Sequence, residues 1–315
     1  MARPIRFRVV PQEEGMMLGH IVARRLPGTD LERAKELVRA GAVYMGHLRV
    51  RVPTARVATG ERISVYPASE GDGLEPLPLD VVRFVHREDD FAVLDKPAGV
   101  PVAATRENAR GTLAEALRRR LEADGVVRPY VGIVHRLDRG ASGLVLFTTR
   151  SIANKSVHQQ FVDHAIVRRY RVLVHGETPD RFDCALPLLE LHSGTSKVAQ
   201  GNPHARAAVS HFVRLRARAP VPGSSLVQVE LETGRHHQIR VHAAALGHAV
   251  VGDRRYGEAA DDGDAARAEP HTGGLHLFAR ELAFEHPQRR EPMRLLAPTP
   301  AWAAAIDDEH DPAVP

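Results

Sequence analysis

The sequence predicts an α+β fold divided between two domains. At roughly 150 residues per domain, the 315 residues of the chain suggest two. Strand-like and helix-like segments follow one another at irregular intervals, which favours α+β over a regular βαβ repeat. Residues 67–80 separate two such regions, and their Pro, Gly and acidic residues without periodicity predict a linker. We therefore expect a small α/β domain over residues 1–66 and a larger domain over 81–300.

Residues 31–40 carry the clearest helical pattern of the first domain. Four apolar side chains share one face of this helix: Leu31, Ala34, Leu37 and Val38. Charged side chains, Lys35 and Arg39 among them, face outward, as in an amphipathic helix that packs one face on a core. Asp30 precedes the helix as its expected N-cap, and Gly41 follows it as its expected C-cap.

The other expected elements of this domain are an earlier helix over 16–26 and short strands over 42–50 and 62–66. Two short helices followed by a small hairpin, with basic residues exposed, resemble the S4 RNA-binding domain. That resemblance implies that the domain binds RNA and that Lys35 and Arg39 contact it. A structural N-terminal cap is the alternative interpretation.

The larger domain shows both strand and helix patterns. Strands are expected over 91–95, 144–149, 170–175, 226–232 and 276–285. Helices are expected over 112–123, 151–163 and 235–247. An acidic low-complexity loop over 258–274 follows, and residues 301–315 are expected to form a disordered tail.

Charge is distributed unevenly along the chain. Residues 1–66 carry 12 Lys and Arg against 6 Asp and Glu, whereas residues 257–315 carry 5 against 12. Arg greatly outnumbers Lys, and its planar fork can contact two phosphate oxygens at once. A polyanionic partner is one explanation, and a coding bias toward Arg is the other.

Other classes of protein are disfavoured by the sequence. The single cysteine, Cys184, excludes an internal disulfide framework and favours the cytoplasm. No apolar stretch approaches the roughly 20 residues that span a bilayer, and the basic N-terminus lacks the apolar segment of a signal peptide. His236, His237 and His242 lie close in sequence, but no HExxH-type zinc pattern accompanies them. We expect a monomer with no membrane and no metal partner.

The segment with the most informative chemistry is VHRLDRGASGLVLF, residues 134–147. Asp138 lies here between Arg136 and Arg139, and a turn of small residues and an apolar strand follow. Two neighbouring guanidinium groups favour the ionised carboxylate. An ionised Asp held on a turn suits a nucleophile or a general base. A salt-bridged surface turn has the same pattern, so this motif alone leaves both interpretations open.

Further motifs in the same domain narrow the choice. They are KPAGVPV (96–102), HRLDRGASG (135–143), RRYRVLV (168–174), TGRHHQIRVH (233–242), GDRRYG (252–257) and HLFARELAFEHP (276–287). In this order and at these spacings they resemble the RluA family of RNA pseudouridine synthases, across residues 82–290. The resemblance implies a mixed, largely antiparallel sheet, the pseudouridine synthase fold. It also implies conversion of specific uridines in structured RNA to pseudouridine, without a cofactor.

The resemblance also implies residue roles. Asp138 is the expected catalytic aspartate, which either attacks the base or sugar or removes the C2′ proton. Tyr170 is expected to pack on the target base and assist proton transfer at C5, and Arg240 to pair with Asp138 and orient it. Arg136 and Arg139 are expected to bind RNA, and Arg136 either fills the space of a flipped uridine or holds its displaced partner. Lys96 and the GDRRYG segment are expected to shape the pocket.

Two alternatives in function remain. A non-catalytic RNA-binding protein would keep the same fold, but Asp138, Tyr170 and Arg240 together argue against it. A nucleosidase would ordinarily pair two carboxylates, whereas here a single Asp lies among Arg residues. Ribosomal RNA is favoured over transfer RNA as the target because of the S4-like domain.

Overall fold

The computed structural model describes residues 4–39, 41–46, 48–66, 76–104, 111–191, 194–217, 219–257 and 274–304. The chain forms two compact units. Unit 1 comprises Met1–Val81 and Pro101–Val127, and unit 2 comprises Val82–Val100 and Arg128–Pro315. The predicted helix over 112–123 therefore belongs to unit 1 rather than to the unit that contains Asp138.

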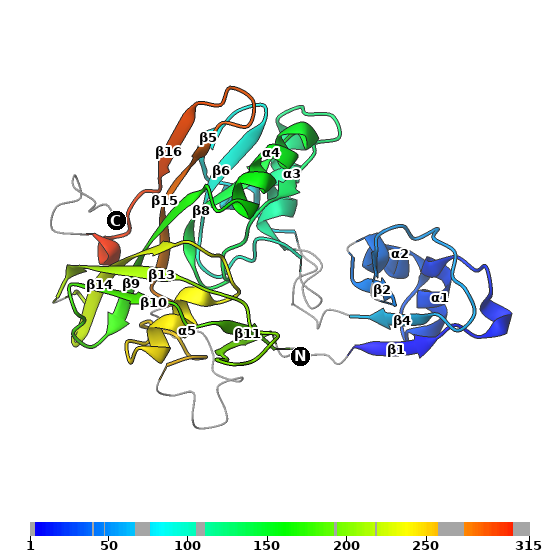
Figure 1. The fold of residues 1–315 in the computed structure, drawn as a ribbon. Coiled ribbons are helices and arrows are strands. Elements are labelled where there is room, and N and C mark those ends of the chain that lie inside the picture. Colours follow the sequence, from blue (N-terminus) through cyan, green and yellow to red (C-terminus); the bar gives the residue numbers. More distant parts are fainter. Residues whose placement is uncertain are drawn as a thin grey trace. The chain divides into compact units, whose positions relative to one another are not determined.

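Unit 1 contains a four-stranded antiparallel sheet in the order β1-β4-β2-β3. The strands are β1 (Ile5–Arg8), β2 (Val43–Met45), β3 (Leu48–Val50) and β4 (Arg62–Val65). Two helices, α1 (Leu18–Arg25) and α2 (Leu31–Arg39), pack on each other and share an apolar core with the sheet (Figure 1). Strand β1 was not expected from the sequence. Its four residues, IRFR, alternate two apolar residues with two Arg, and this pattern is too short to predict a strand.

Helix α2 confirms the expected helix and both of its caps. The Oδ1 of Asp30 accepts a hydrogen bond of 2.7 Å from the backbone N–H of Arg33. Gly41 has φ +79°, a left-handed conformation that glycine adopts without strain and that ends the helix. Ala34, Leu37 and Val38 are buried, while Leu31 is only partly so.

The end of the predicted linker is ordered. Residues 67–75 lie outside the described residues, but Leu79–Val81 form a short 3-10 helix, η2. It packs against helix α3 (Leu113–Ala123), and the Arg119 guanidinium donates to the backbone oxygen of Leu77 at 2.8 Å. The expectation of a linker through residue 80 is therefore wrong at its C-terminal end, because these apolar residues find a packing partner.

Unit 2 is built on a ten-stranded sheet in the order β10-β13-β14-β9-β15-β8-β6-β5, with β16 paired to β15 and β7 to β8. Its strands are β5 (Phe84–Arg87), β6 (Phe91–Lys96), β7 (Gly132–Ile133), β8 (Ser142–Thr148), β9 (Val167–His175), β10 (Arg181–Cys184), β13 (Ser210–Arg216), β14 (Ser224–Leu231), β15 (Leu277–Glu285) and β16 (Pro292–Leu296). Only the β8–β15 pair is parallel among the pairs described. The prediction of an α+β fold with a mixed, largely antiparallel sheet is confirmed.

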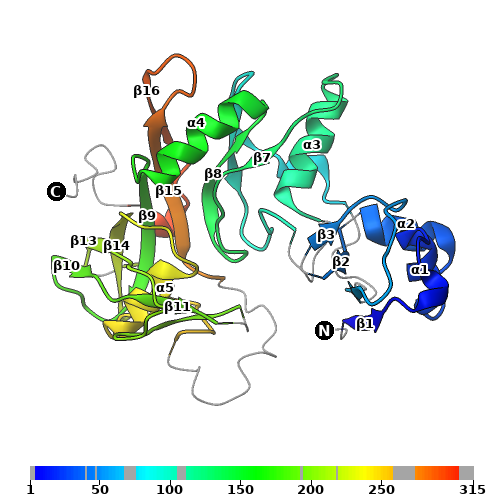
Figure 2. The ribbon, with the colours of Figure 1, turned by 45° about the vertical axis from the view of Figure 1, so that its right-hand side comes forward.

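The helices and a small hairpin complete unit 2. Helix α4 (Ser151–Val162) packs across β8 and β15 (Figure 2). A separate two-stranded hairpin, β11 (Leu188–Glu190) and β12 (Ser196–Val198), lies beside helix α5 (Gln238–Ala245). Helix α5 begins later than the predicted residue 235, because His237 adopts a left-handed conformation (φ 56°) that starts the helix only at the next residue.

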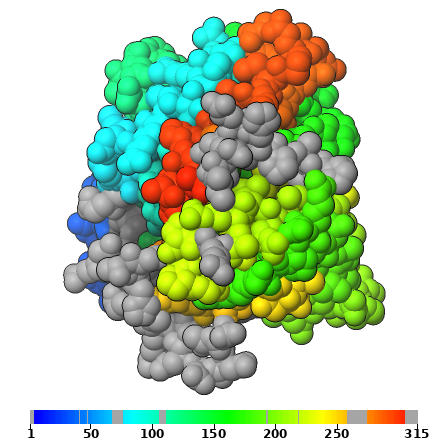
Figure 3. Space-filling model, turned by 90° about the vertical axis from the view of Figure 1, so that its left-hand side faces the viewer, coloured from blue at the N-terminus to red at the C-terminus, as the bar shows by residue number. Residues whose placement is uncertain are grey.

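The C-terminal end of the described chain is packed, not disordered. Ala301–Ala303 form a short 3-10 helix, η4, and Ala303 is buried. The backbone oxygen of Ala303 accepts a 2.9 Å hydrogen bond from the buried guanidinium of Arg171. Figure 3 shows this segment in red at the surface of unit 2. The expected tail is thus wrong for residues 301–304, while 305–315 lie outside the described residues, as does the acidic loop expected over 258–274 except for its last residue, Gly274.

Candidate active site

Asp138 lies in the turn that leads into β8. The backbone N–H of Ala141 donates to the backbone oxygen of Asp138 at 3.1 Å, which closes the turn. Gly143 follows with φ +101°, and a Cβ there would lie 2.3 Å from the backbone oxygen of Ala279. The small residues after Asp138 therefore let β8 approach β15 closely. This close approach fixes the turn at the start of β8, an inner strand of the sheet.

The partner of Asp138 comes from helix α5. The Nη1 of Arg240 donates to the Oδ2 of Asp138 at 2.9 Å, so the structure brings together two residues that are 102 positions apart. Arg139 donates from Nε to the backbone oxygen of Gly99 instead, and Arg136 is exposed. The interpretation that the two neighbouring Arg side chains hold Asp138 is therefore wrong, because the guanidinium at the carboxylate is that of Arg240.

A second carboxylate holds the other edge of Arg240. The Nε and Nη2 of Arg240 donate to the two oxygens of Asp253 at 2.7 and 2.8 Å. The Asp253 side chain is fully buried, and it also accepts the backbone N–H groups of Arg255 and Tyr256. Burial alone would raise the pKa of Asp253, but the hydrogen bonds from Arg240 outweigh it and the pKa is lowered. Arg240 is thus fixed between a buried carboxylate and a partly exposed one.

Lys96 ties a neighbouring loop to the Asp138 turn. Its ammonium group donates to three backbone oxygens, those of Pro97, Val100 and Arg139, at 3.0, 2.9 and 3.1 Å. These bonds use all three of its protons in a fully buried position. Burial lowers the pKa of Lys96 to about 7, against the negative charge of Asp138, which raises it. Lys96 therefore holds the backbone of residues 97–100 against the turn that carries Asp138.

Tyr170 lies on the central strand β9, where it pairs with Val229 of β14 and Ala279 of β15. Its side chain is buried, and burial raises the pKa of its hydroxyl. The positive charge of Arg168 lowers that pKa, and the negative charge of Asp138 raises it. The structure therefore gathers Asp138, Arg240 and Tyr170 in unit 2.

Two more side chains at this site, His237 and Tyr256, were not expected to act on Asp138, although the segment of Tyr256 was expected to shape the pocket. The Nε2 of His237 lies 3.8 Å from the Oδ1 of Asp138. The Nδ1 of His237 lies 2.7 Å from the Tyr256 hydroxyl, and the Tyr256 ring stacks under the Arg240 guanidinium at 5.0 Å. Both residues belong to motifs quoted from the sequence, TGRHHQIRVH and GDRRYG. The signal was present, but only the fold shows that the two motifs meet.

The predicted RNA contacts of unit 1 lie on helix α2. The ammonium group of Lys35 pairs with Glu32 at 2.6 Å, and Arg39 is exposed. An ion pair of this kind between exposed side chains is weak, so it does not prevent Lys35 from contacting a phosphate. These two residues belong to unit 1, whereas Asp138, Arg136 and Arg139 belong to unit 2.

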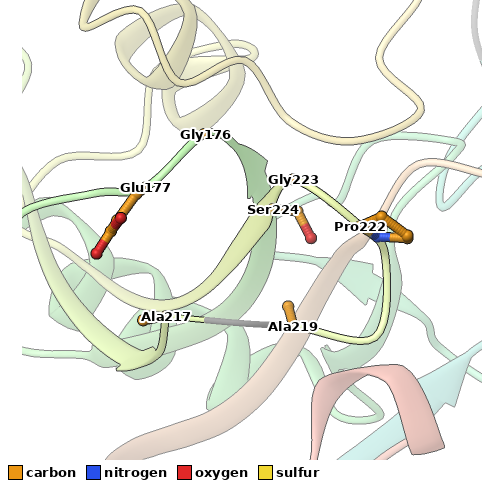
Figure 4. A pocket seen from close by; sticks show the side chains of 7 residues that line it. All are labelled: Gly176, Glu177, Ala217, Ala219, Pro222, Gly223 and Ser224. Carbon is orange, nitrogen blue, oxygen red and sulfur yellow. The ribbon is translucent and has the colours of Figure 1, made fainter.

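Other features of the described residues carry no competing site. No group of three His, Cys, Asp or Glu in the described ranges could hold a metal ion. No described helix is long and apolar enough to cross a membrane. Cys184 is buried and free. An open pocket of about 380 Å³ is lined by Gly176, Glu177, Ala217, Ala219, Pro222, Gly223 and Ser224 (Figure 4). None of the predicted site residues lines it, and among the described lining residues only Glu177 has an ionisable side chain.

Comparisons with known proteins identify the family and the fold. The model of a family described as RNA pseudouridylate synthase matches residues 90–245. An uncharacterized RNA pseudouridine synthase of Aquifex aeolicus is 30% identical over 297 residues, which cover 91% of this chain and 90% of that protein. Ribosomal large subunit pseudouridine synthase D of Zymomonas mobilis is 31% identical over 284 residues, 87% of each chain.

Among solved structures, human RNA pseudouridylate synthase domain containing 1 is similar in fold. The TM-score is 0.57 at 26% sequence identity, and the match covers 72% of this chain and 86% of that one. A second human protein, RNA pseudouridylate synthase domain containing 4, matches with a TM-score of 0.53 at 21% identity and supports the fold alone.

Proposed function

The chain belongs to the RluA family of RNA pseudouridine synthases, and from this premise we propose that it modifies specific uridines of large-subunit ribosomal RNA with Asp138 as its catalytic carboxylate. Synthase activity follows from membership of the family. The proposal concerns the RNA that is modified and the residues that do the chemistry.

The observation that supports the proposal most strongly is how Arg240 divides its hydrogen bonds between Asp253 and Asp138. Two of its three nitrogens bind Asp253, and only Nη1 reaches Asp138, at Oδ2. Asp138 is therefore oriented by one charge-assisted hydrogen bond, while its Oδ1 makes no bond to Arg240. An oriented carboxylate with one oxygen left over suits both forms of the reaction, attack on the substrate and removal of a proton.

The chemistry needs only groups that the chain supplies. The bond between N1 of uracil and C1′ of ribose breaks, the base turns, and C5 bonds to C1′. The proton on C5 then leaves, and N1 gains one, so atoms balance without a redox change or a cofactor. Asp138 either bonds to the substrate or takes the C2′ proton and returns it. Tyr170 packs on the base and assists proton transfer at C5.

The proposed target RNA rests on the names of the relatives and on the basic charge of unit 1. Several relatives that match most of the chain are named ribosomal large subunit pseudouridine synthase C or D. Unit 1 adds a basic module, and we assign it an S4-like role in RNA binding through Lys35 and Arg39. Arg136 and Arg139 contact RNA beside the flipped uridine, whose unstacking costs a few kcal/mol. We propose that the protein acts as a monomer in the cytoplasm, without a bound metal.

A deletion strain tests the proposal. Pseudouridine is mapped across ribosomal and transfer RNA in the deletion strain, and in the same strain carrying the wild-type gene or the D138N variant. We expect one or a few large-subunit positions to lose pseudouridine on deletion, to regain it with the wild type and to stay unmodified with D138N. Restored modification by D138N would refute the role of Asp138, and losses confined to transfer RNA would refute the choice of target.

A further inference from the structure

The oxygen of Asp138 that Arg240 leaves unbound faces the ring of His237. Nη1 of Arg240 donates to Oδ2, while Nε2 of His237 lies 3.8 Å from Oδ1. The two side chains are mostly buried, with exposed fractions of 9% for His237 and 18% for Asp138. The distance is longer than a hydrogen bond, but such contacts are often long without substrate and shorten in the complex.

Hydrogen bonds at the other side of the ring decide where its proton lies. The backbone N–H of Ser196 donates to the Tyr256 hydroxyl oxygen at 2.9 Å. The hydroxyl then has its own proton to donate, and Nδ1 of His237 lies 2.7 Å away. We assign Nδ1 as the acceptor of this proton, which places the proton of the neutral ring on Nε2. A proton on Nε2 is also favourable there, since a lone pair would face the carboxylate of Asp138.

The surroundings keep the ring neutral. Burial lowers the pKa of His237 to about 3. The negative charge of Asp138 raises that pKa, whereas the charges of Arg240, His236 and Arg255 lower it. The ring of His236 stacks on that of His237, with centroids 3.8 Å apart. His237 is thus a neutral donor at the pH of the cytoplasm, and not a second cation beside Asp138.

The groups that fix this donor come from three separate segments. Ser196 lies on β12, Tyr256 follows the buried Asp253, and His237 immediately precedes α5. The Tyr256 ring is in turn held under the guanidinium of Arg240. The hairpin β11–β12 is therefore linked through two hydrogen bonds to His237, which faces Asp138, although neither of its strands contains a residue of the reaction.

We propose that His237 is a positioning residue for Asp138. Its Nε2–H, fixed by the Tyr256 hydroxyl and the Ser196 N–H, donates to Oδ1 of Asp138 when the uridine is bound and holds that oxygen toward the ribose. The proposal rests on the role of Asp138 proposed above. Arg240 and His237 would then control one carboxylate oxygen each.

The backbone of His237 permits a sharp test. Its φ of 56° lies in the left-handed region, which Asn adopts more readily than Gln. If the residue only supports the backbone, H237N is the better replacement. If it donates from Nε2, H237Q is the better one, because its amide reaches the position of Nε2 and that of Asn does not. The two variants carry the same chemical group and differ by one methylene.

The measurement is the single-turnover rate at saturating RNA, together with the RNA dissociation constant. We expect H237N to lower the rate about ten- to a hundredfold, as for a lost hydrogen bond to a charged group, and H237Q to recover most of it. RNA affinity is expected to stay within about threefold in both variants, since the His237 side chain is only 9% exposed and offers little surface to a phosphate. Equal rates for the two variants, or a faster H237N, would overturn the proposal.

Y256F tests the fixed tautomer and keeps the ring under Arg240. In the wild type, nitrogen-15 NMR of the histidine ring should show a protonated Nε2 and an acceptor Nδ1. In Y256F we expect a mixture of tautomers and a severalfold lower rate. An unchanged spectrum and rate would show that Tyr256 does not fix the ring. D138N separates the two proposals: if it is active, the assigned function fails, whereas if it is inactive and the His237 variants match the wild type, only this inference fails.

Discussion

Arg240 in unit 2 and the basic side chains of α2 in unit 1 use the same kind of charge in opposite ways. Arg240 is 11% exposed and binds carboxylates with all three guanidinium nitrogens. The side chain of Lys35, 28% exposed, pairs with that of Glu32, 72% exposed, and Arg39 is exposed on the same helix. A buried cation is held in one position by its hydrogen bonds. In an exposed ion pair, water and salt ions readily replace the partner. The buried cation therefore suits positioning, and the exposed ones suit phosphate.

The largest effect should follow from breaking the buried arrangement. R240A removes the group that orients Asp138 and leaves Asp253 buried without its partner, so it is expected to cost about 3–5 kcal/mol of stability. R240K keeps the charge but lacks the fork, and cannot serve both carboxylates. We expect R240K to lower the single-turnover rate at least about a hundredfold with little change in RNA affinity. Weakened RNA binding at a normal rate would mean that Arg240 contacts phosphate instead.

D253N sharpens the comparison without removing the cation. The Asn keeps the size of the side chain but no longer holds two guanidinium nitrogens by charge. Arg240 can then turn toward Asp138 and bind both of its oxygens, including Oδ1. We expect about a tenfold lower single-turnover rate and a lower unfolding temperature, with unchanged RNA affinity. A variant that loses only stability would show that Asp253 supports the fold and does not set the position of Arg240.

The exposed cations should show the opposite pattern. In the double variant K35Q/R39Q, each lost phosphate contact should reduce the slope of log K against log salt by about 0.9. RNA affinity is expected to fall severalfold at physiological salt, while the rate at saturating RNA stays that of the wild type. R33Q is the matched control, because Arg33 pairs with Glu36 on the same helix and is not an expected RNA contact. An unchanged salt slope in the double variant would favour the structural-cap interpretation of unit 1.

The smallest effect is expected at a histidine between two carboxylates in unit 2. The ring nitrogens of His211 lie 2.8 Å from Asp183 and 2.8 Å from Glu232. Burial alone would lower the pKa of His211, but these hydrogen bonds outweigh it and raise the pKa. A raised pKa stabilises the fold below the unfolded value of about 6.5, and the effect is lost as the pH rises through the folded value.

H211Q tests this pH dependence. Because both carboxylates are largely exposed, the wild type should exceed the variant by at most about 1 kcal/mol of unfolding free energy near pH 5.5. The difference should shrink toward alkaline pH. Denaturant unfolding at several pH values measures it, and a difference that grows with pH would contradict the assigned charge of His211.

The sequence predicted those helices and strands whose own residues show a clear apolar pattern. The apolar run of β8, SGLVLFT, and the periodic face of α2 with its Asp30 cap and Gly41 appear as expected. Strands β1 and β16 were missed, because IRFR and PMRLL are short segments interrupted by Arg and show no clear apolar pattern. The start of α5 was placed too early, because the left-handed turn at His237 leaves no local signal.

The active site shows more clearly that local sequence patterns do not predict contacts between distant segments. Sequence neighbours suggested that Arg136 and Arg139 hold Asp138, whereas the partner lies 102 residues away. Only the similarity to a family pointed to Arg240. The arrangement of Asp253, Tyr256 and Ser196 around it depends on how separate segments pack, which no single stretch of sequence encodes. The catalytic roles of Asp138, Tyr170 and Arg240 stay predictions until the variants are measured.

The docked end of the chain provides an optical probe. Trp302, the only tryptophan of the protein, lies in η4, with its ring edge-on to His276 at 5.0 Å and to Phe278 at 6.4 Å. Its fluorescence should therefore report the packing of η4 on unit 2 and stay silent to events confined to unit 1. Tyrosines occur in both units, Tyr44 in unit 1 and Tyr170 in unit 2 for example. Excitation of tryptophan alone thus follows the melting of unit 2 in the intact protein.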